Sequence, residues 1–472
     1  MFPSLVFNDH PSFDLLEKTS LSDIPDDQLV KLIQLSCPHS QFPSLFFNPS
    51  KSLSKPSLAT CLSSHIFPNV SPVHNMNPQI RVIGHSDAVY CLAFDITNQL
   101  LITGSDDNNI KIWDYSSNTL MESFHYHSLE ITDVQVHPSN EFFATCSLDC
   151  SISVISLHDF SLINSLNFDS EVHIIRFSPD GKYMAVALDE GNVKILKVPT
   201  YENYFTIPSP KKKAVAWLSF SPAGEFLIFS ADPHDLVIFS MNTFKMEKIR
   251  NEHSQLPDFV SFSRHNCKQI ISCSYEEHCV KVWEFDDKTR KWLVPSNGNL
   301  VLRHPNTHKV KVFRACFNCD DSNIVAISKN CISCWDTQTK ALINTSTNEI
   351  FTEHCTALAM HPSLPNIAFI GCASGRASIW DTNLGEVIAP LQIDDATKIT
   401  EAIWSNDGLS IVAGDEKGGY TKFSYGKQPF ISINQFFLSE FTNNPQDHTI
   451  ITDILQQPLD PQPKMSKISD FQ

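Results

Sequence analysis

Four cysteines in the second half of the chain have a spacing that could hold a metal ion. Cys316-x-x-Cys319 is followed by Cys331-x-x-Cys334, and two such pairs of thiolates are a common ligand set for zinc. Both pairs are predicted to lie on strands or at strand ends. Cys331 and Cys334, three positions apart on one strand, would then point to opposite faces. We therefore expect buried thiols and no metal here.

Other side chains suggest chemistry less strongly. The sequence holds no glycine-rich phosphate loop, no H-E-x-x-H and no G-x-S-x-G, which are the usual marks of nucleotide, zinc-protease and hydrolase sites. A His–Asp pair, His85 and Asp107, belongs to a pattern that is repeated along the chain. Lys211, Lys212 and Lys213 form a basic run that is either a solvated loop or a contact for a partner. We expect neither a catalytic residue nor a cofactor.

The stretch SDDNNIKIWDYSSNT (105–119) shows which elements position these residues. It holds a polar turn, an alternating apolar run and the dipeptide Trp113-Asp114. Related stretches return at intervals of 41 to 52 residues, mostly near 43. The residues that align with the tryptophan are Trp113, Ile155, Leu196, Phe239, Trp283, Trp335, Trp380 and Phe423.

Each repeat has the composition of a small antiparallel sheet. In the first, alternating apolar residues predict strands over 89–94, 100–105, 110–115 and 120–126. The segment Asp-Asp-Asn-Asn between the second and third strands suits a tight turn. A period near 43, with Gly-His before and Trp-Asp at the end of the unit, is the signature of WD40 propeller blades.

Counting strands predicts how the ring closes. Eight triplets of strands succeed one another up to residue 424, and the segment PQIRVIGH (78–85) precedes them all. The last triplet lacks a fourth strand of the usual kind, so we expect 78–85 to supply it. Closure of this kind removes exposed sheet edges. The predicted fold is an all-β WD40 propeller of eight blades.

The tryptophan of the first unit has a predicted structural role that involves four residues. We expect His85, Thr103 (or Ser105), Asp107 and Trp113 to form a buried chain of hydrogen bonds. An indole can only donate and a carboxylate can only accept, so the imidazole and the hydroxyl must connect them. A satisfied network of this type stiffens a blade. This tetrad is predicted to be structural, and the other units depart from it.

The flanks differ from the repeats. We assign residues 1–77 to an N-terminal helical segment and linker, with helical spacing of apolar residues over 12–37. The propeller takes 78–424. Residues 425–472 form a C-terminal extension whose composition predicts disorder.

Charge restricts the class of partner. The chain has 472 residues and a formal net charge of −17, and residues 79–423 hold 28 Lys or Arg against 41 Asp or Glu. An acidic body repels phosphate backbones, so basic proteins are favoured over nucleic acids. No apolar run reaches 18 residues, which predicts no membrane span, and the N-terminus lacks the basic and apolar regions of a signal peptide.

The first three units also resemble a particular family. HSDAVYCLAFDITNQLLITGSDDNNIKIWD, HSLEITDVQVHPSNEFFATCSLDCSISV and SPKKKAVAWLSFSPAGEFLIFSADPHDLVIFS are similar to the WD region of the bromodomain and WD repeat proteins. The segment NQFFLSEF (434–441) is similar to the stretch after the ring in that family. The resemblance implies an eight-bladed ring in a nuclear, chromatin-associated scaffold, with a role as substrate receptor of a cullin-4 ubiquitin ligase as the alternative.

Two departures limit what the resemblance implies. No bromodomain comes after the ring in this sequence, so acetyl-lysine recognition is not expected from it. The adaptor-binding signature Trp-Asp-x-Arg is replaced by WDYS, WDTQ and WDTN, so any docking of the ligase adaptor would fall to the helices over 12–37. We expect a non-enzymatic scaffold in the nucleus, or alternatively the cytoplasm, that binds basic proteins such as histone tails. A hydrolase or metal enzyme that uses the central channel is the competing class.

Overall fold

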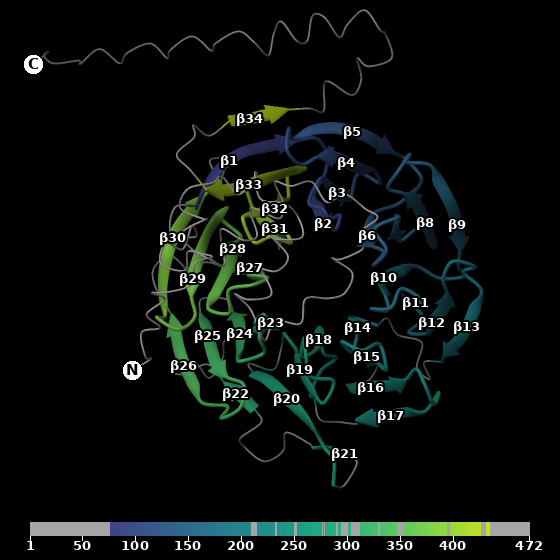
Figure 1. The fold of residues 1–472 in the computed structure, drawn as a ribbon, viewed down its shortest axis with the longest axis vertical. Coiled ribbons are helices and arrows are strands. Elements are labelled where there is room, and N and C mark those ends of the chain that lie inside the picture. The colour runs from purple at the N-terminus through teal and green to yellow at the C-terminus, as the bar shows by residue number, and fades with distance from the viewer. Residues whose placement is uncertain are drawn as a thin grey trace, which may run out of the picture.

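The computed structural model consists of eight antiparallel sheets arranged as blades around a central axis (Figure 1). In the described part of the chain every regular element is a strand, which confirms the predicted all-β propeller of eight blades. The helical segment predicted within 1–77 lies outside the described residues. The structure describes residues 76–208, 215–231, 234–249, 253–275, 277, 279–288, 291–293, 301–303, 312–328, 331–346, 354–393, 397–425 and 431–434.

The blades are numbered in chain order, each with its innermost strand first. Blades one and two consist of β2 (Val89–Phe94), β3 (Leu100–Ser105), β4 (Ile110–Asp114), β5 (Thr119–Phe124), and of β6 (Ile131–Val136), β7 (Phe142–Ser147), β8 (Ser151–Ser156), β9 (Leu162–Asn167). Blades three and four consist of β10 (Val172–Phe177), β11 (Tyr183–Leu188), β12 (Val193–Lys197), β13 (Asn203–Ile207), and of β14 (Leu218–Phe220), β15 (Phe226–Ala231), β16 (Asp235–Ser240), β17 (Met246–Ile249).

The second half of the ring has the same order. Blades five and six consist of β18 (Phe259–Phe262), β19 (Gln269–Cys273), β20 (Cys279–Asp286), β21 (Lys291–Leu293), β22 (Val301–Arg303), and of β23 (Val312–Phe317), β24 (Asn323–Ser328), β25 (Ile332–Asp336), β26 (Leu342–Ser346). Blades seven and eight consist of β27 (Cys355–Met360), β28 (Ile367–Cys372), β29 (Arg376–Asp381), β30 (Glu386–Gln392), and of β31 (Ile399–Trp404), β32 (Ser410–Asp415), β33 (Gly419–Tyr425), β1 (Met76–Ile83), β34 (Ile431–Asn434).

Burial depends on the radial position of a strand. In blade two every residue of β7 and β8 is buried, whereas the outer strand β9 alternates between exposed and half-buried positions. The middle strands are buried on both faces because each face packs against a neighbouring blade. Between blades one and two, Ile102 and Ile112 pack in one cluster with Phe143 and Ile155. The core of the molecule is thus a series of apolar layers between blades.

The eight residues aligned with Trp113 occupy equivalent places. Each lies on the third strand of its blade, and none is more than 4% exposed. The aromatic or large aliphatic side chain at this position therefore fills the same interior site in every repeat. This agreement confirms the period from which the blade count was predicted.

The ring closes as the sequence predicts. Strand β1 pairs antiparallel with β33, with Val82 opposite Tyr420 and Ile83 opposite Gly419. Strand β34, which lies in the segment assigned to the C-terminal extension, pairs in parallel with the outer edge of β1. Blade eight is therefore built from both ends of the repeat region, so unfolding of β1 would open the ring.

The outer edge of blade five is irregular. The segment 286–300 holds β21, and β22 comes directly after it. Both strands pair with the long strand β20, β21 at one end and β22 at the other. The outer edge of blade five is therefore shared by two short strands, which alternation over so few residues could not reveal.

In the described part of the chain, no helix has the length and apolar character that crossing a bilayer requires.

Candidate functional site

The four residues expected to stabilise blade one lie in a single chain of hydrogen bonds. The indole Nε1 of Trp113 donates to Thr103 Oγ1 over 3.0 Å. The same hydroxyl lies 2.7 Å from His85 Nε2, and His85 Nδ1 lies 3.0 Å from the carboxylate of Asp107. Ser105, the alternative hydroxyl, instead donates to the carbonyl of Asp87.

The protonation states of this chain depend on its surroundings. Burial lowers the pKa of His85, and the hydrogen bond to Asp107 offsets only part of that effect. Burial alone would raise the pKa of Asp107, but His85 and the amides of Ser86 and Asn109 lower it to about 2. At neutral pH the imidazole is therefore neutral and the carboxylate ionised, and each donor in the chain points toward Asp107. The four side chains are thus hydrogen-bonded to one another within the blade.

Blade five completes the same network with a glutamate, a residue type that the sequence pattern presents as a departure. Trp283 Nε1 donates to Ser272 Oγ over 2.8 Å, and that hydroxyl lies 2.7 Å from His253 Nε2. His253 Nδ1 lies 2.5 Å from Glu277. The six-residue spacing from Glu277 to Trp283 equals that from Asp107 to Trp113, and this spacing is the signal that could have identified the glutamate as the acceptor.

Two other blades retain only parts of the network. In blade two His127 lies 3.2 Å from Asp149 and 2.9 Å from Thr145, but Ile155 replaces the tryptophan. Blade seven keeps Trp380 but has Ile370 and Ser374 at the hydroxyl and carboxylate positions. Within the described residues Trp380 Nε1 has no hydrogen-bond partner.

A buried ion pair holds the closing strand. Arg81 Nε on β1 lies 2.9 Å from Asp415 Oδ2 on β32, and both side chains are at most 1% exposed. The other carboxylate oxygen accepts the amides of Lys417 and Gly419 over 2.8 and 3.2 Å. Arg81 and Asp415 are more than 300 positions apart in sequence, and no local pattern linked them. The pair joins the two ends of the propeller directly.

The four cysteines with zinc-like spacing do not converge. Cys331 contacts Thr345 Oγ1 at 3.3 Å, and Cys334 is fully buried in the apolar cluster between blades six and seven. Burial raises the pKa of Cys319 to about 11 and that of Cys334 to about 12. Among the described residues these thiols form no group able to hold a metal ion.

The inner strands carry charged groups that neutralise one another. Arg314 on β23 makes two hydrogen bonds to the carboxylate of Glu401 on β31, over 2.7 and 3.1 Å. Its guanidinium lies 5.5 Å from the ring centre of Trp217, and Arg176 lies 5.2 Å from the same ring. These contacts connect blades three, four, six and eight at the inner side of the ring. These side chains therefore contact one another across the inner side of the ring.

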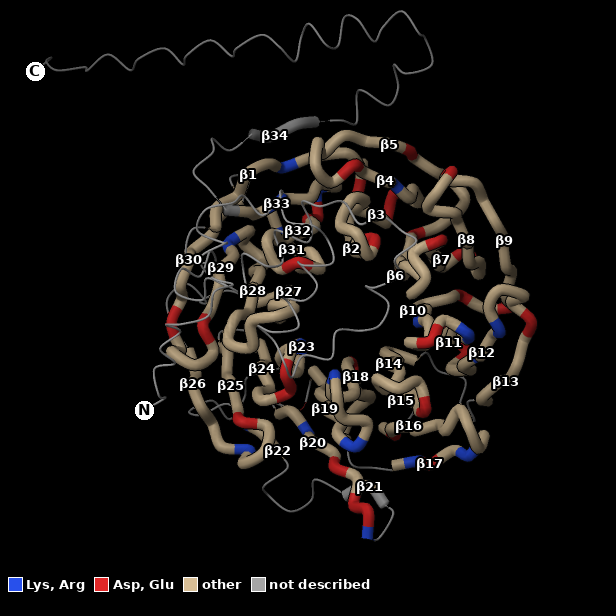
Figure 2. The backbone as a smooth tube through the Cα atoms, viewed as in Figure 1, with Lys and Arg blue, Asp and Glu red and all other residues tan. Residues whose placement is uncertain are grey.

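One end of the ring is strongly acidic around blades one to three. The turns that precede each inner strand and those between the second and third strands lie at the same end of the sheets. In these three blades they span 84–88, 106–109, 125–130, 148–150, 168–171 and 189–192, and we call them the acidic face (Figure 2). They contain no Lys or Arg and nine carboxylates: Asp87, Asp106, Asp107, Glu130, Asp149, Asp169, Glu171, Asp189 and Glu190.

The carboxylates of the acidic face are close enough to repel one another. Partial burial, and then the charges of Asp87, Glu130 and Asp107, raise the pKa of Asp106. The turns at the opposite end of the same three blades carry five carboxylates and one lysine. Tyr90, the second residue of β2, is 43% exposed, and partial burial and the charges of Asp106, Glu416 and Asp87 raise its pKa. The acidic face thus combines negative charge with an exposed aromatic ring.

The basic run Lys211, Lys212 and Lys213 lies outside the described residues. Its role as a contact for a partner stays a prediction.

Comparison with known proteins agrees with the geometry. The family model described as "WD domain, G-beta repeat" matches residues 77–114 and 118–156. The chain is an eight-bladed β-propeller whose first two blades match WD40 repeats. The matched segments cover the first blade and most of the second, where the His, hydroxyl and Asp positions are best kept. WD40 propellers are protein-interaction scaffolds, and their fold by itself does not identify a partner.

Three similar proteins match this chain at low identity. A bromodomain and WD repeat-containing protein of Dictyostelium discoideum is 21% identical over 83% of this chain and 21% of its own length. A p21-activated protein kinase-interacting protein 1-like protein of Gallus gallus is 24% identical over 45% of this chain and 58% of its own. A pre-mRNA-processing factor 19 homologue of Arabidopsis thaliana is 28% identical over 37% of this chain and 33% of its own.

These relatives therefore extend beyond the part that the present chain matches, since it spans 58% of one and 21% of another. Among solved structures, the computationally designed Ika8 protein superposes with a TM-score of 0.60 at 19% identity, over 74% of this chain and all of the other. That likeness supports the fold alone.

Proposed function

We propose that this propeller is a non-enzymatic scaffold that binds Lys- and Arg-rich proteins of the nucleus, histone tails among them, through its acidic face. The observation that carries the proposal is the set of nine carboxylates without a single Lys or Arg on one end of blades one to three. Such a concentration of one sign attracts cationic segments over several ångströms and repels nucleic-acid phosphates.

The exposed ring of Tyr90 adds a second recognition element. It is 43% exposed at the end of β2 that meets the acidic face, so a lysine or arginine side chain that docks on this face could contact the ring. Nuclear localisation is favoured by the likeness to the bromodomain and WD repeat-containing protein of Dictyostelium discoideum. The proposed role at chromatin rests on the same likeness.

A binding experiment with charge reversal tests the proposal. The full chain is titrated with core histones at rising salt, beside the Asp106→Lys/Glu130→Lys variant. The control is Glu141→Lys/Glu202→Lys, which makes the same change of charge at the opposite end of blades two and three. We expect salt-sensitive binding that only the first variant loses, because it adds repulsion where the partner docks. Equal loss in both variants, or no binding at low salt, would reject the acidic face.

A second candidate is a substrate receptor of a cullin-4 ubiquitin ligase, which the family resemblance implies. The helices predicted over 12–37 would dock the adaptor, and they lie outside the described residues. Co-purification of the adaptor with the full chain, lost on deletion of 12–37, supports this role. Co-purification that survives the deletion places adaptor docking elsewhere.

A further inference from the structure

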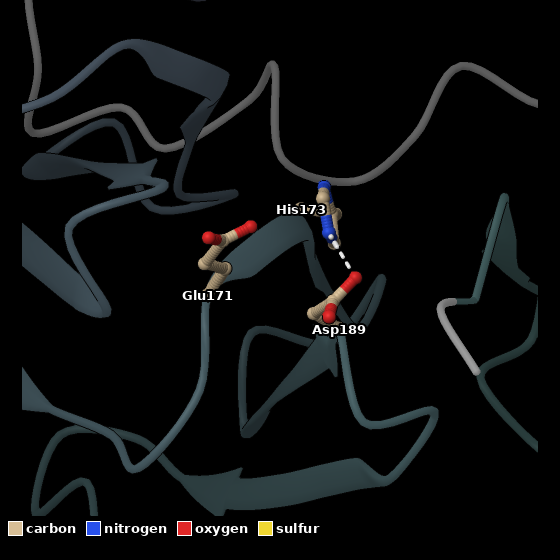
Figure 3. Close-up of side chains that lie close together, drawn as sticks. All are labelled: Glu171, His173 and Asp189. Atoms are coloured by element: carbon tan, nitrogen blue, oxygen red, sulfur yellow. Dashed lines mark hydrogen bonds and ion pairs between the residues drawn. The ribbon is translucent and has the colours of Figure 1, made fainter. Parts of the chain in front are cut away.

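Three potential metal ligands converge on the acidic face at blade three. Glu171 lies in the turn before β10, His173 is the second residue of β10, and Asp189 comes directly after β11. One ligand atom from each lies within 4.8 Å of the other two. Figure 3 shows His173 and Asp189 pointing toward each other, with the Glu171 carboxylate beside them. The sequence predicts no metal in this chain, and no motif in it connects these three residues.

We propose that Glu171, His173 and Asp189 form a binding site for a divalent transition-metal ion, for which Zn²⁺ is the probe. One imidazole and two carboxylates make a mixed nitrogen and oxygen donor set, which suits zinc better than calcium or magnesium. Three protein ligands leave at least one coordination position for water or for a donor from a partner.

The spacing of the donors fits a tetrahedral ion. His173 Nε2 lies 3.2 Å from Asp189 Oδ1. Two ligands bound to zinc at 2.0–2.1 Å with tetrahedral angles stand about 3.3 Å apart, so this pair needs almost no movement. The proton now shared between the two side chains is the one that a metal ion would displace.

The backbone holds the three ligands on a rigid frame. The amide of Asp189 donates to the carbonyl of Glu171 over 2.9 Å, and β10 and β11 are paired from Val172 and Leu188 onward. The pairing of β10 with β11 has a bulge between Val172 and Ile174, so His173 stands at this irregularity, two positions after Glu171. The side chains of His173 and Asp189 are 30% and 55% exposed, so an ion from solvent can reach them.

The same frame recurs in other blades without the full set of ligands. In blade two the amide of Leu148 donates to the carbonyl of Glu130 over 3.2 Å, and Thr132 stands at the position of His173. In blade eight the amide of Glu416 donates to the carbonyl of Lys398 over 3.1 Å. Among the described blades only blade three has a metal ligand at all three positions, so the cluster belongs to this blade and not to the repeat.

Zinc titration of the full chain tests the site. Isothermal titration with ZnCl₂ compares the wild-type protein with His173→Ala and Asp189→Asn. The control is His158→Ala, which removes an exposed histidine at the opposite end of blade two. Removal of a residue that only supports a metal ligand weakens metal affinity by about 10-fold to 100-fold. We expect each ligand variant to weaken zinc binding by no less than this. The control should bind as the wild type does.

A variant designed to gain a zinc site distinguishes loss of a ligand from loss of zinc binding through misfolding. Thr132→His/Leu148→Asp places the missing ligands beside Glu130 in blade two, and we expect it to bind a second zinc ion. Far-UV circular dichroism and Tm without metal show that each variant is folded. The proposal is overturned if the wild type binds no zinc at millimolar concentration, or if both ligand variants bind it unchanged. Because no protein partner takes part, either result is independent of the proposed scaffold function.

Discussion

Blades one and seven bury a tryptophan at the same place but treat its polar atom differently. Trp113 and Trp380 both lie on the third strand and are fully buried. In blade one the indole donates to Thr103 and the chain continues to Asp107. In blade seven Ile370 takes the place of the hydroxyl, and within the described residues the indole nitrogen has no partner. The shape of the tryptophan is thus required in both blades, and its hydrogen bond in only one.

The surroundings of the two blades also differ, although blade five has the complete network without lying at the seam. Blade one lies at the seam where the ring closes, beside the Arg81–Asp415 pair, and Tyr115 donates to Ser410 of blade eight over 2.6 Å. Blade seven is inside a continuous run of blades and packs through an apolar cluster that includes Cys355 and Cys372. A seam between distant parts of the chain needs directional contacts to set its register, whereas consecutive blades are already joined by short turns. Substitutions at matched positions of the two blades can test this difference.

The largest effect is expected from Arg81→Ala at the seam. The substitution leaves the Asp415 carboxylate buried without its ion-pair partner, which destabilises by about 3–5 kcal/mol. Arg376→Ala, an exposed arginine on β29 of blade seven, should change stability by less than about 0.5 kcal/mol. Urea unfolding followed by fluorescence measures both, and hydrogen exchange should show β1 and β33 opening first in Arg81→Ala. Equal midpoints would show that the seam does not depend on this pair.

A second prediction concerns acid. Because the pKa of Asp107 is lowered to about 2 in the folded chain, its stabilising effect is complete above the ordinary pKa near 4 and is lost as pH falls toward 2. A shift of this size corresponds to about 2 kcal/mol. His85, whose pKa is also lowered, stays neutral in the fold, so acidification below about pH 6.5 destabilises through it as well.

The Asp107→Asn variant measures how much of the loss of stability in acid is due to the Asp107 carboxylate. Urea midpoints between pH 7 and pH 2 should fall less steeply in this variant than in the wild type, by about 2 kcal/mol overall. Ser374→Asn, at the corresponding position of blade seven, should leave the slope unchanged. Parallel slopes for all three proteins would mean that Asp107 titrates normally.

A third prediction removes the hydroxyl that joins Trp113 to His85. Thr103→Val keeps the shape but leaves two buried polar groups without a partner, which destabilises by about 1–3 kcal/mol. Ile370→Val at the matching position of blade seven removes only a methylene group and should destabilise by about 0.5–1.5 kcal/mol. The two variants are compared by urea midpoint. If Ile370→Val is the more destabilising variant, packing contributes more to stability than the hydrogen bonds of Thr103, in blade one as in blade seven.

The smallest effect is expected from giving blade seven the missing hydroxyl. In Ile370→Thr the new hydroxyl can accept from Trp380, so a hydrogen bond of about 0.5–1.5 kcal/mol offsets part of the lost apolar burial. Ile102→Thr, on the buried strand β3 of blade one, gains no such bond and should be the more destabilising of the two. Thermal unfolding measures the difference. The reverse order would mean that Trp380 does not reach the new hydroxyl.

Features set by near neighbours could be predicted from the sequence. The strand at 89–94, the tight turn after Ser105 and the spacing from Asp107 to Trp113 all depend on residues within one repeat. A hairpin fixes its own register, so alternation and turn residues are enough to locate it. The closing role of 78–85 could also be predicted, because a count of strands left that segment without a blade.

The features missed by sequence reasoning depend on contacts between distant or unusual partners. Glu277 departs from the residue type at this position of the network, yet its longer side chain reaches His253 and completes it. The strand β21 in the segment 286–300 is three residues long and pairs only because β20 extends beyond its usual length. The longer side chain of Glu277 and the longer strand β20 each allow a contact that the local sequence pattern does not predict.

A ring of eight four-stranded repeats, with a complete hydrogen-bonded network in the first, could be predicted from the residues alone, because period, alternation and turn composition are local properties. The folded chain was needed to show that Arg81 meets Asp415, that β34 extends the last blade, and that Glu171, His173 and Asp189 lie close together. Such meetings depend on how strands far apart in the chain, or on different sides of a turn, are brought into register. The order of residues along the chain does not give the distances in space between strands that are far apart in sequence.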